Sequence, residues 1–119
     1  MTAFPSARTG SGLIFTSGLA AIDPETFTIL SDTFEGQAKE VFRQLDQALD
    51  QAGSDRTRVL RLECYLADRS YFPAWNALFA TYFPTAAPAR ITTVTTLPID
   101  GLLIEIQAIA IATAQEDRS

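Results

Sequence analysis

The 119-residue sequence predicts an α+β fold, a two-layer sandwich in which two helices cover one face of a mixed β-sheet. Three observations carry this prediction. Residues 34–52 repeat apolar side chains with the period of a helix, the segments on either side have strand-like patterns, and a second helical segment separates two of those strands. A chain of this length with 47% hydrophobic residues is expected to form one domain, residues 1–119.

The first third of the chain is typical of β-structure. Residues 13–17 form a short strand-like run, and residues 19–22 resume it after one glycine, before a turn sequence at 23–26. We expect a β-hairpin or meander here. Residues 4–9 could add an edge strand, in which Pro5 would occupy a position that needs no amide donor.

The first helix is predicted to lie between Asp32 and Gly53. Its apolar side chains follow the i, i+3, i+4, i+7 spacing of one helical face. They are Phe34, Ala38, Val41, Phe42, Leu45, Ala48, Leu49 and Ala52. Asp32 is expected to cap the N-terminus, and Glu35 three residues later completes a capping-box-like start. Gly53 supplies the left-handed residue that commonly ends a helix.

A strand and a second helix follow. Residues 58–66 alternate, and one apolar set is predicted to face the helices: Leu60, Leu62, Cys64 and Leu66. The second helix is expected from about Ser70 to about Phe83, with Pro73 tolerated in its first turn. Its inward face is predicted to carry Phe72, Trp75, Phe79 and Tyr82 or Phe83.

Two further strands are predicted at residues 90–97 and 102–112. The first is rich in β-branched residues, and the second is apolar at all but two positions. We expect them to form an antiparallel pair joined across residues 98–101. The last strand carries apolar side chains on both faces. Helices on one side of the sheet and another subunit on the other would explain this pattern.

Composition excludes several functions. The net charge is −5 and Lys39 is the single lysine, so a phosphate-binding surface for nucleic acid is not expected. The lone Cys64 and the absence of histidine exclude an internal disulfide, a Ser-His-Asp triad and a zinc site of the usual kind, so we predict no metal. The N-terminus lacks the apolar core of a signal peptide, and no run reaches the roughly 18 apolar residues of a membrane span. A cytoplasmic protein without a membrane partner is expected.

Arg90 is the first candidate for a functional residue. It opens a strand directly after the proline-containing segment 84–89, where a rigid loop would hold its guanidinium at a rim. A guanidinium binds a carboxylate through two parallel hydrogen bonds. The alternative is a surface arginine that pairs with a nearby acidic residue.

Glu105 is the second candidate. A carboxylate inside so apolar a strand is paired, protonated or facing a pocket, and burial would raise its pKa, as a proton-shuttling acid requires. Gln107, on the same face, could be its partner. Alternatively, Glu105 points to solvent from an edge strand.

In the predicted hairpin Glu105 lies opposite Val94, and Val94 is four residues, or about 13 Å, from Arg90. Both would then meet one ligand only across a subunit boundary or after a register shift.

Three further positions are weaker candidates. Ser17-Gly18 offers a hydroxyl and a backbone that a ligand can approach, or is simply a β-bulge. Asn76 is polar among aromatic helix positions, or forms a structural hydrogen bond to a loop. Cys64 is expected to belong to the core, because it lies on the inward face of its strand.

Several different short motifs follow one another in a specific order along nearly the whole chain. The most specific are Pro88-Ala89-Arg90, then Leu97-Pro98, then I-E-I-Q-A-I-A at residues 104–110. Supporting matches are residues 13–18, 23–26, 52–53 and 65–68, with Gln37, Trp75-Asn76 and Tyr82-Phe83. This arrangement resembles the Rid (YjgF-like) family, whose pattern is P-A-R, a short strand, L-P, and E-I-E-A-I-A.

The resemblance implies a chorismate-mutase-like fold that assembles as a homotrimer, with ligand sites between subunits. It implies that Arg90 grips the substrate carboxylate, that Glu105 positions the attacking water, and that Ser17, Gly18 and Asn76 line the cleft. The implied reaction is hydrolysis of a 2-imino or 2-enamino acid to a 2-oxo acid and ammonia, without a cofactor.

Three residues differ from the family pattern. Phe4 aligns with the usual tyrosine and lacks its hydroxyl, Leu19 replaces a glutamine and makes the cleft wall more apolar, and Thr92 replaces a cysteine. All three are expected to contact the substrate. Two other functions stay open: a carboxylate-binding or chaperone-like trimer without catalysis, and an endoribonuclease, which the acidic composition and absent histidine disfavour.

Overall fold

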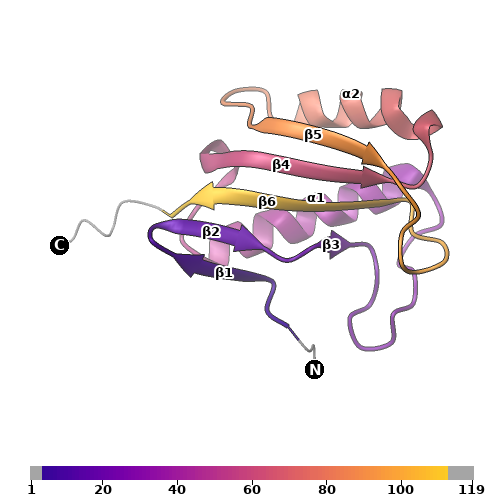
Figure 1. The fold of residues 1–119 in the computed structure, drawn as a ribbon, viewed down its shortest axis with the longest axis horizontal. Helices are drawn as coiled ribbons and strands as arrows, with labels where there is room; N and C mark the ends of the chain where they lie inside the picture. The colour runs from indigo at the N-terminus through magenta and orange to yellow at the C-terminus, as the bar shows by residue number, and fades with distance from the viewer. Residues whose placement is uncertain (1–3, 113–119) are drawn as a thin grey trace.

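The computed structural model describes residues 4–112 as two layers, a β-sheet and two helices on one of its faces (Figure 1). Within these residues the strand order is β1-β2-β6-β4-β5, and β3 also pairs with β6. The strands are β1 Ala7–Gly10, β2 Leu13–Thr16, β3 Leu19–Ala20, β4 Val59–Leu66, β5 Ala89–Val94 and β6 Ile104–Ile111. The helices are α1 Phe34–Gln51 and α2 Phe72–Tyr82, with 3₁₀ turns at Arg56–Arg58 and Arg69–Tyr71. The predicted α+β sandwich with a mixed sheet is confirmed.

The last strand, β6, occupies the centre of the sheet. It pairs antiparallel with β2 and β3 on one side and with β4 on the other. The predicted hairpin between the last two strands is therefore wrong, because β5 pairs with β4 and in parallel. A strand-helix-strand crossover brings its two strands parallel, and β4, α2 and β5 form such a unit. Glu105 lies opposite Tyr65 and Ala20 rather than Val94.

The N-terminal hairpin joins β1 to β2. Its turn contains Ser11 and Gly12 with φ of 54° and 78°, as a two-residue turn between antiparallel strands requires. The predicted edge strand at residues 4–9 corresponds to β1, with Pro5 outside the ladder. The predicted turn at 23–26 also forms, because Asp23 Oδ1 accepts a hydrogen bond from the backbone N–H of Glu25 at 2.8 Å.

Ser17 and Gly18 form a bulge between β2 and β3. Leu13 pairs with Ile111, whereas Leu19 pairs with Ile106, so one extra residue is inserted on the N-terminal side of the ladder. Both segments run in the same direction along β6, so residues 19–20 resume the strand as predicted. The expected hairpin forms between β1 and β2, and Ile22 pairs antiparallel with Ile29 across the turn at 23–26. The bulge interpretation of Ser17-Gly18 is confirmed.

Helix α1 is capped by Thr33 and not by Asp32. Thr33 is still extended (φ −107°, ψ 152°), and its Oγ1 accepts a hydrogen bond from the N–H of Gly36 at 3.0 Å. The predicted cap was one residue too early because the helical turn starts only at Phe34. Gly53 follows the helix with φ of 77°, as predicted, and the N–H of Ser54 donates to Leu49 O at 2.8 Å.

A bulge at the start of β4 changes which side chains face the helices. The ladder with β6 slips between Val59 and Arg61, so Val59 is 3% exposed and Leu60 is 46% exposed. The prediction that Leu60 faces inward is wrong, since an extra residue reverses the alternation on one side of it. The other three predicted residues, Leu62, Cys64 and Leu66, are fully buried.

The aromatic face of α2 completes the core. Trp75 is fully buried and Phe83 nearly so, and the ring of Phe79 lies 5.9 Å from that of Trp75. Phe72 was predicted to face inward, but it is 41% exposed, because its ring lies beside the Arg90 guanidinium at the sheet edge. Neither helix in residues 4–112 is long and apolar enough to cross a membrane.

Gln37 connects α1 to the segment that leads into β6. Its side chain is fully buried. Nε2 donates to the backbone oxygens of Ser31 (2.9 Å) and Gly101 (2.8 Å), and Oε1 accepts from the N–H of Leu103 (2.8 Å). One amide thus satisfies three backbone groups, two of them just before β6 begins.

Replacing Gln37 with Leu is expected to lower the free energy of unfolding by about 3 kcal/mol, because buried backbone groups lose their partners. Urea denaturation followed by circular dichroism measures this change. Gln47→Leu, at an exposed position of the same helix, is the matched control and should change stability by less than about 0.5 kcal/mol. Equal destabilisation by both substitutions would contradict this role of Gln37.

Candidate functional site

The predicted site residues fall into two groups. We call Arg90, Asn76 and Thr92 the arginine half-site, and Phe4, Ser17, Gly18, Leu19 and Glu105 the glutamate half-site. Arg90 and Thr92 belong to the edge strand β5, whereas Leu19 belongs to β3, on the far side of β4 and β6. Three strand spacings separate β5 from β3, which amounts to about 14 Å.

Arg90 and Glu105 also lie on opposite faces of the sheet, whereas Leu19, which pairs with the buried Ile106, is on the helix side. Arg90 pairs with Leu62 and shares its face, which the helices cover. Glu105 alternates with the fully buried Ile104 and Ile106, so its side chain lies on the face away from the helices. Arg90 and Glu105 of one chain therefore do not touch, as expected. The cause is the strand order and the opposite faces of the sheet, whereas the prediction rested on the register of a hairpin.

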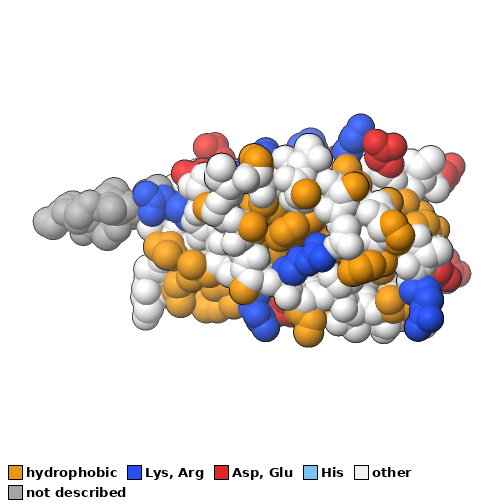
Figure 2. All heavy atoms as spheres, turned by 90° about the horizontal axis from the view of Figure 1, so that it is seen from above, with side chains coloured by type: hydrophobic (Ala, Val, Ile, Leu, Met, Phe, Trp, Pro, Cys, Tyr) orange, Lys and Arg blue, Asp and Glu red, His pale blue; other side chains and the backbone are white. Residues whose placement is uncertain are grey.

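Arg90 is held by side chains of α2. Its Nη2 donates a hydrogen bond to Asn76 Oδ1, and its Cζ lies 4.6 Å from the centroid of the Phe79 ring. Within residues 4–112 it forms no ion pair, which is against the alternative of a surface arginine with an acidic partner. Figure 2 views the molecule from the β5 and α2 edge and shows one basic side chain among apolar ones near the middle of this face. Such a guanidinium can bind a carboxylate.

Thr92 and Cys64 lie on the strands beside Arg90. Thr92 Oγ1 accepts a hydrogen bond from Trp75 Nε1 at 3.2 Å, which directs its hydroxyl at α2. Cys64 is opposite Thr92 in the β4–β5 ladder and is fully buried. Burial raises the pKa of the Cys64 thiol to about 12, so it stays protonated at neutral pH and is no nucleophile. Cys64 is a core residue, as predicted.

The bulge in the glutamate half-site brings Gly18 against Glu105. A Cβ atom at position 18 would overlap the Glu105 carboxylate, so the glycine leaves the space that this carboxylate occupies. Ser17 attaches the N-terminal segment: its Oγ donates to Pro5 O at 2.7 Å and its N–H to Ser6 O at 2.8 Å.

Glu105 forms no hydrogen bond or ion pair with another of residues 4–112, and burial raises the pKa of its carboxyl group above the usual range. The alternative of an edge strand is excluded, because β6 is central. The predicted partner is also wrong, since Gln107 Nε2 donates to Glu63 Oε1 (2.9 Å) and to the Tyr65 hydroxyl (3.1 Å). A carboxyl group in this state is suited to taking up and returning a proton.

A groove of about 450 Å³ opens between the N-terminal segments and α1, and the Glu105 side chain does not line it. Phe4, Ser17, Gly18 and Leu19 lie along one wall, and polar side chains of α1 form the other. Phe4 is 58% exposed, whereas Leu19 is buried. The volume is sufficient for a small organic acid. No group of three His, Cys, Asp or Glu side chains among residues 4–112 is arranged to hold a metal ion.

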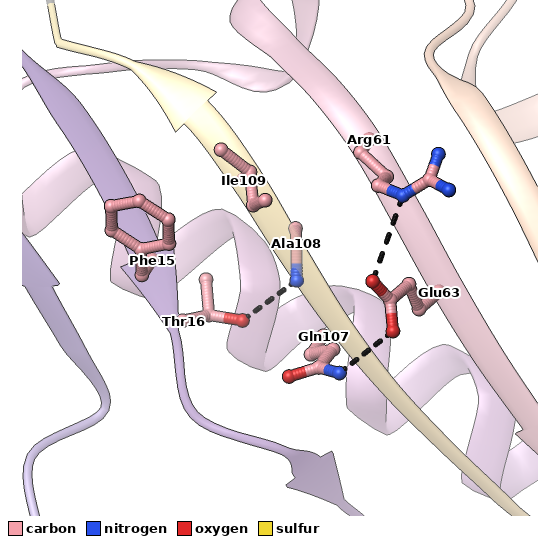
Figure 3. A pocket seen from close by; sticks show the side chains of 7 residues that line it. All are labelled: Phe15, Thr16, Arg61, Glu63, Gln107, Ala108 and Ile109. Carbon is pink, nitrogen blue, oxygen red and sulfur yellow. Dashed lines mark hydrogen bonds and ion pairs between the residues drawn. The ribbon is translucent and has the colours of Figure 1, made fainter.

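Sequence reasoning missed a polar group on the face of the sheet away from the helices. The Tyr65 hydroxyl donates to Glu63 Oε1 at 2.8 Å, and Gln107 Nε2 donates to the same Glu63 oxygen and to the Tyr65 hydroxyl. Arg61 Nε lies 3.6 Å from Glu63 Oε2. Arg61, Glu63 and Gln107 line a cavity of about 110 Å³ together with Phe15, and Figure 3 shows these side chains around it. Alternation in β4 could have placed three of these residues on one face, but only the register with β6 brings Gln107 to them.

The model of the endoribonuclease L-PSP family matches residues 2–112. Reactive Intermediate Deaminase A from the chloroplast of Arabidopsis thaliana is 34% identical over 108 residues, which are 90% of this chain and 57% of that protein, so the chain spans little more than half of its length. A RutC family protein from Synechocystis sp. is 38% identical over 111 residues, covering 91% of this chain and 85% of that protein.

Solved structures agree with the sequence comparison. The crystal structure of YyfA from Yersinia pestis, of the conserved Rid protein family, superposes with a TM-score of 0.85 at 26% sequence identity. The match covers 94% of this chain and 90% of that one. Because the family model matches almost the whole length and two relatives are 34% and 38% identical over the matched residues, the chain belongs to the endoribonuclease L-PSP family, the family of the Rid (YjgF) proteins.

Proposed function

We propose that the protein hydrolyses 2-imino acids and their 2-enamino tautomers to 2-oxo acids and ammonia, without a cofactor, in clefts between the copies of a homotrimer. One observation carries this proposal. Among residues 4–112, a guanidinium without a carboxylate partner lies on the edge strand β5, and a carboxyl group without a partner lies on the opposite face of the central strand β6. The name of the Arabidopsis relative supports the reaction class.

A second copy of the chain would complete the site. Because Arg90 lies on the edge strand β5 and Glu105 on the opposite face of the central strand β6, a closed ring of copies can bring the arginine half-site of one subunit to the glutamate half-site of the next. The face away from the helices supports assembly, since Phe15, Ile91 and Ile111 are 45%, 49% and 39% exposed on it. Exposed apolar surface of this kind is often an interaction site.

In the proposed reaction, Arg90 binds the carboxylate of the protonated imine through two parallel N–H groups and so fixes the position of C2. Ionised Glu105 accepts a proton from water as the water oxygen bonds to C2 and the C=N electron pair moves to nitrogen. Glu105 then returns this proton to the amino group. The C–N bond breaks, and ammonia leaves with the hydroxyl proton as ammonium, which forms the 2-oxo acid.

Binding of carboxylates without turnover is the second candidate function. Phe4 favours it, because this residue presents a ring without a hydroxyl group to the groove. Both functions require Arg90, and they differ in whether an imine is consumed. RNA cleavage is disfavoured by the net charge of −5, and cleavage that is lost on Arg90→Ala would support it instead.

Freshly generated 2-iminobutyrate is expected to be hydrolysed faster with the protein than in buffer. Arg90→Ala should lower kcat/KM by about a hundredfold, and Arg90→Lys by about tenfold, because lysine keeps the charge but loses the two-pronged geometry. Lys39→Ala removes an exposed cation on α1 and is the control. Binding of 2-oxobutyrate without any acceleration by the wild type would establish the binding function in place of the enzyme.

Mixing two inactive variants tests whether the site lies between subunits. Arg90→Ala and Glu105→Gln proteins, unfolded together and refolded as mixed oligomers, should regain about one quarter of the wild-type activity, since that fraction of random neighbours has both residues intact. Activity and molar mass by light scattering are measured on the same sample. If both residues acted within one chain, the mixture would stay as inactive as its components.

Gly18→Ala is expected to displace the Glu105 carboxylate. The fold should tolerate the change, because the displaced group is the end of a flexible side chain. We expect kcat for 2-iminobutyrate to fall by about a hundredfold, while the affinity for 2-oxobutyrate, held by Arg90, changes little. Gly10→Ala is the matched control, since a Cβ atom there meets no atom within 4 Å. A similar fall of kcat in both variants would argue against this role of Gly18.

A further inference from the structure

The guanidinium of Arg90 is enclosed on the side of α2 by three residues of one helical face. Asn76 and Phe79 are three residues apart, and Phe72 precedes Asn76 by four, so all three side chains point in a similar direction. Asn76 Oδ1 accepts the hydrogen bond of Nη2, and Cζ lies 4.6 Å from the Phe79 centroid and 5.9 Å from the Phe72 centroid. These distances are within the range of a cation–π interaction.

The chemistry of these contacts differs from that of an ordinary arginine pair. Both partners are neutral: an amide oxygen takes one N–H group, and an aromatic ring attracts the cation without using any N–H group. An acidic partner would instead cancel the charge and occupy two N–H groups. Within residues 4–112 Arg90 has no such partner. The guanidinium is thus oriented while its charge and its remaining donors stay available.

We propose that Phe79 and Asn76 are positioning residues that orient the Arg90 guanidinium before a carboxylate arrives. This inference rests on the proposed function of Arg90 as the group that binds the substrate carboxylate. A free arginine side chain loses considerable rotamer entropy when it is fixed, and preorganisation removes that cost from the binding step. The buried Trp75, hydrogen-bonded to Thr92, holds α2 in register with β5 and so fixes both positioning residues.

Four variants separate orientation from charge. Phe79→Leu removes the aromatic ring, whereas Phe79→Tyr keeps one. Asn76→Ala removes the acceptor, whereas Asn76→Asp keeps an acceptor of the same size but neutralises Arg90. Phe79 also packs against Trp75 and Phe83, so thermal unfolding is recorded for every variant. The two Asn76 variants leave the aromatic packing of Phe79 unchanged. They therefore still test the positioning role if Phe79→Leu proves unstable.

The first readout needs no ligand. The ¹⁵N order parameter of the Arg90 Nε–H group, assigned by its disappearance in Arg90→Lys, reports how rigidly the side chain is held. We expect a high value in the wild type and in Phe79→Tyr, and lower values in Phe79→Leu and Asn76→Ala. Unchanged order in both Phe79→Leu and Asn76→Ala would overturn the inference.

The second readout is the affinity for 2-oxobutyrate by calorimetry. Phe79→Leu should weaken binding by about three- to thirtyfold and Phe79→Tyr should restore it. Asn76→Asp should keep Arg90 ordered yet weaken binding by about thirtyfold or more, because its carboxylate competes with the ligand. Wild-type affinity in Asn76→Asp would contradict the requirement for a neutral acceptor.

The two readouts distinguish this inference from the proposed function. If the wild type binds no 2-oxobutyrate and hydrolyses no 2-iminobutyrate, while Arg90 loses order in Phe79→Leu and Asn76→Ala, the proposed function fails and the positioning of Arg90 stands. If the wild type is active and binds, but order and affinity are the same in Phe79→Leu, Asn76→Ala and the wild type, the proposed function stands and the positioning role fails.

Discussion

The central position of β6 is the constraint on which the rest of the structure depends. This strand, although it is the last in the chain, separates the N-terminal strands from the β4-α2-β5 unit. Gln37 secures that position from within the core, because its amide bonds to Gly101 O and Leu103 N just before the strand starts. With β6 in the middle, β5 becomes one edge of the sheet and the N-terminal segments lie toward the other.

This arrangement separates the two candidate functional groups of the chain, the Arg90 guanidinium and the Glu105 carboxyl group. Arg90 lies on the edge strand and on the helix side, where α2 supplies neutral partners for its guanidinium. Glu105 lies on the central strand and on the opposite side, against the glycine of a bulge. Neither group neutralises the other, which would happen if they were close in one chain. The separation therefore leaves a cation and a proton acceptor unpaired within the chain, as the proposed cleft between subunits requires.

The sequence predicted correctly those features that depend on residues close together in the chain. The period of α1 and its end at Gly53 follow from helical spacing and from the preference of glycine for positive φ. Two of the wrong predictions concern the strands. Simple alternation misplaced Leu60, because one bulged residue reverses the pattern. The pairing of β5 with β6 was inferred from adjacency in sequence, although a strand-helix-strand unit takes β5 to β4 instead.

By itself, then, the sequence determined the fold class, the limits of the helices to within a residue or two, and the identity of Arg90 and Glu105 as residues whose chemistry needs an explanation. The tertiary structure decided the strand order, the face on which each residue lies, and the neutral partners Asn76 and Phe79 around Arg90. Helix period and turn preference act over a few residues and can be read along the chain. Strand pairing and side-chain contacts depend on segments far apart in sequence, whose proximity is set only when the core packs.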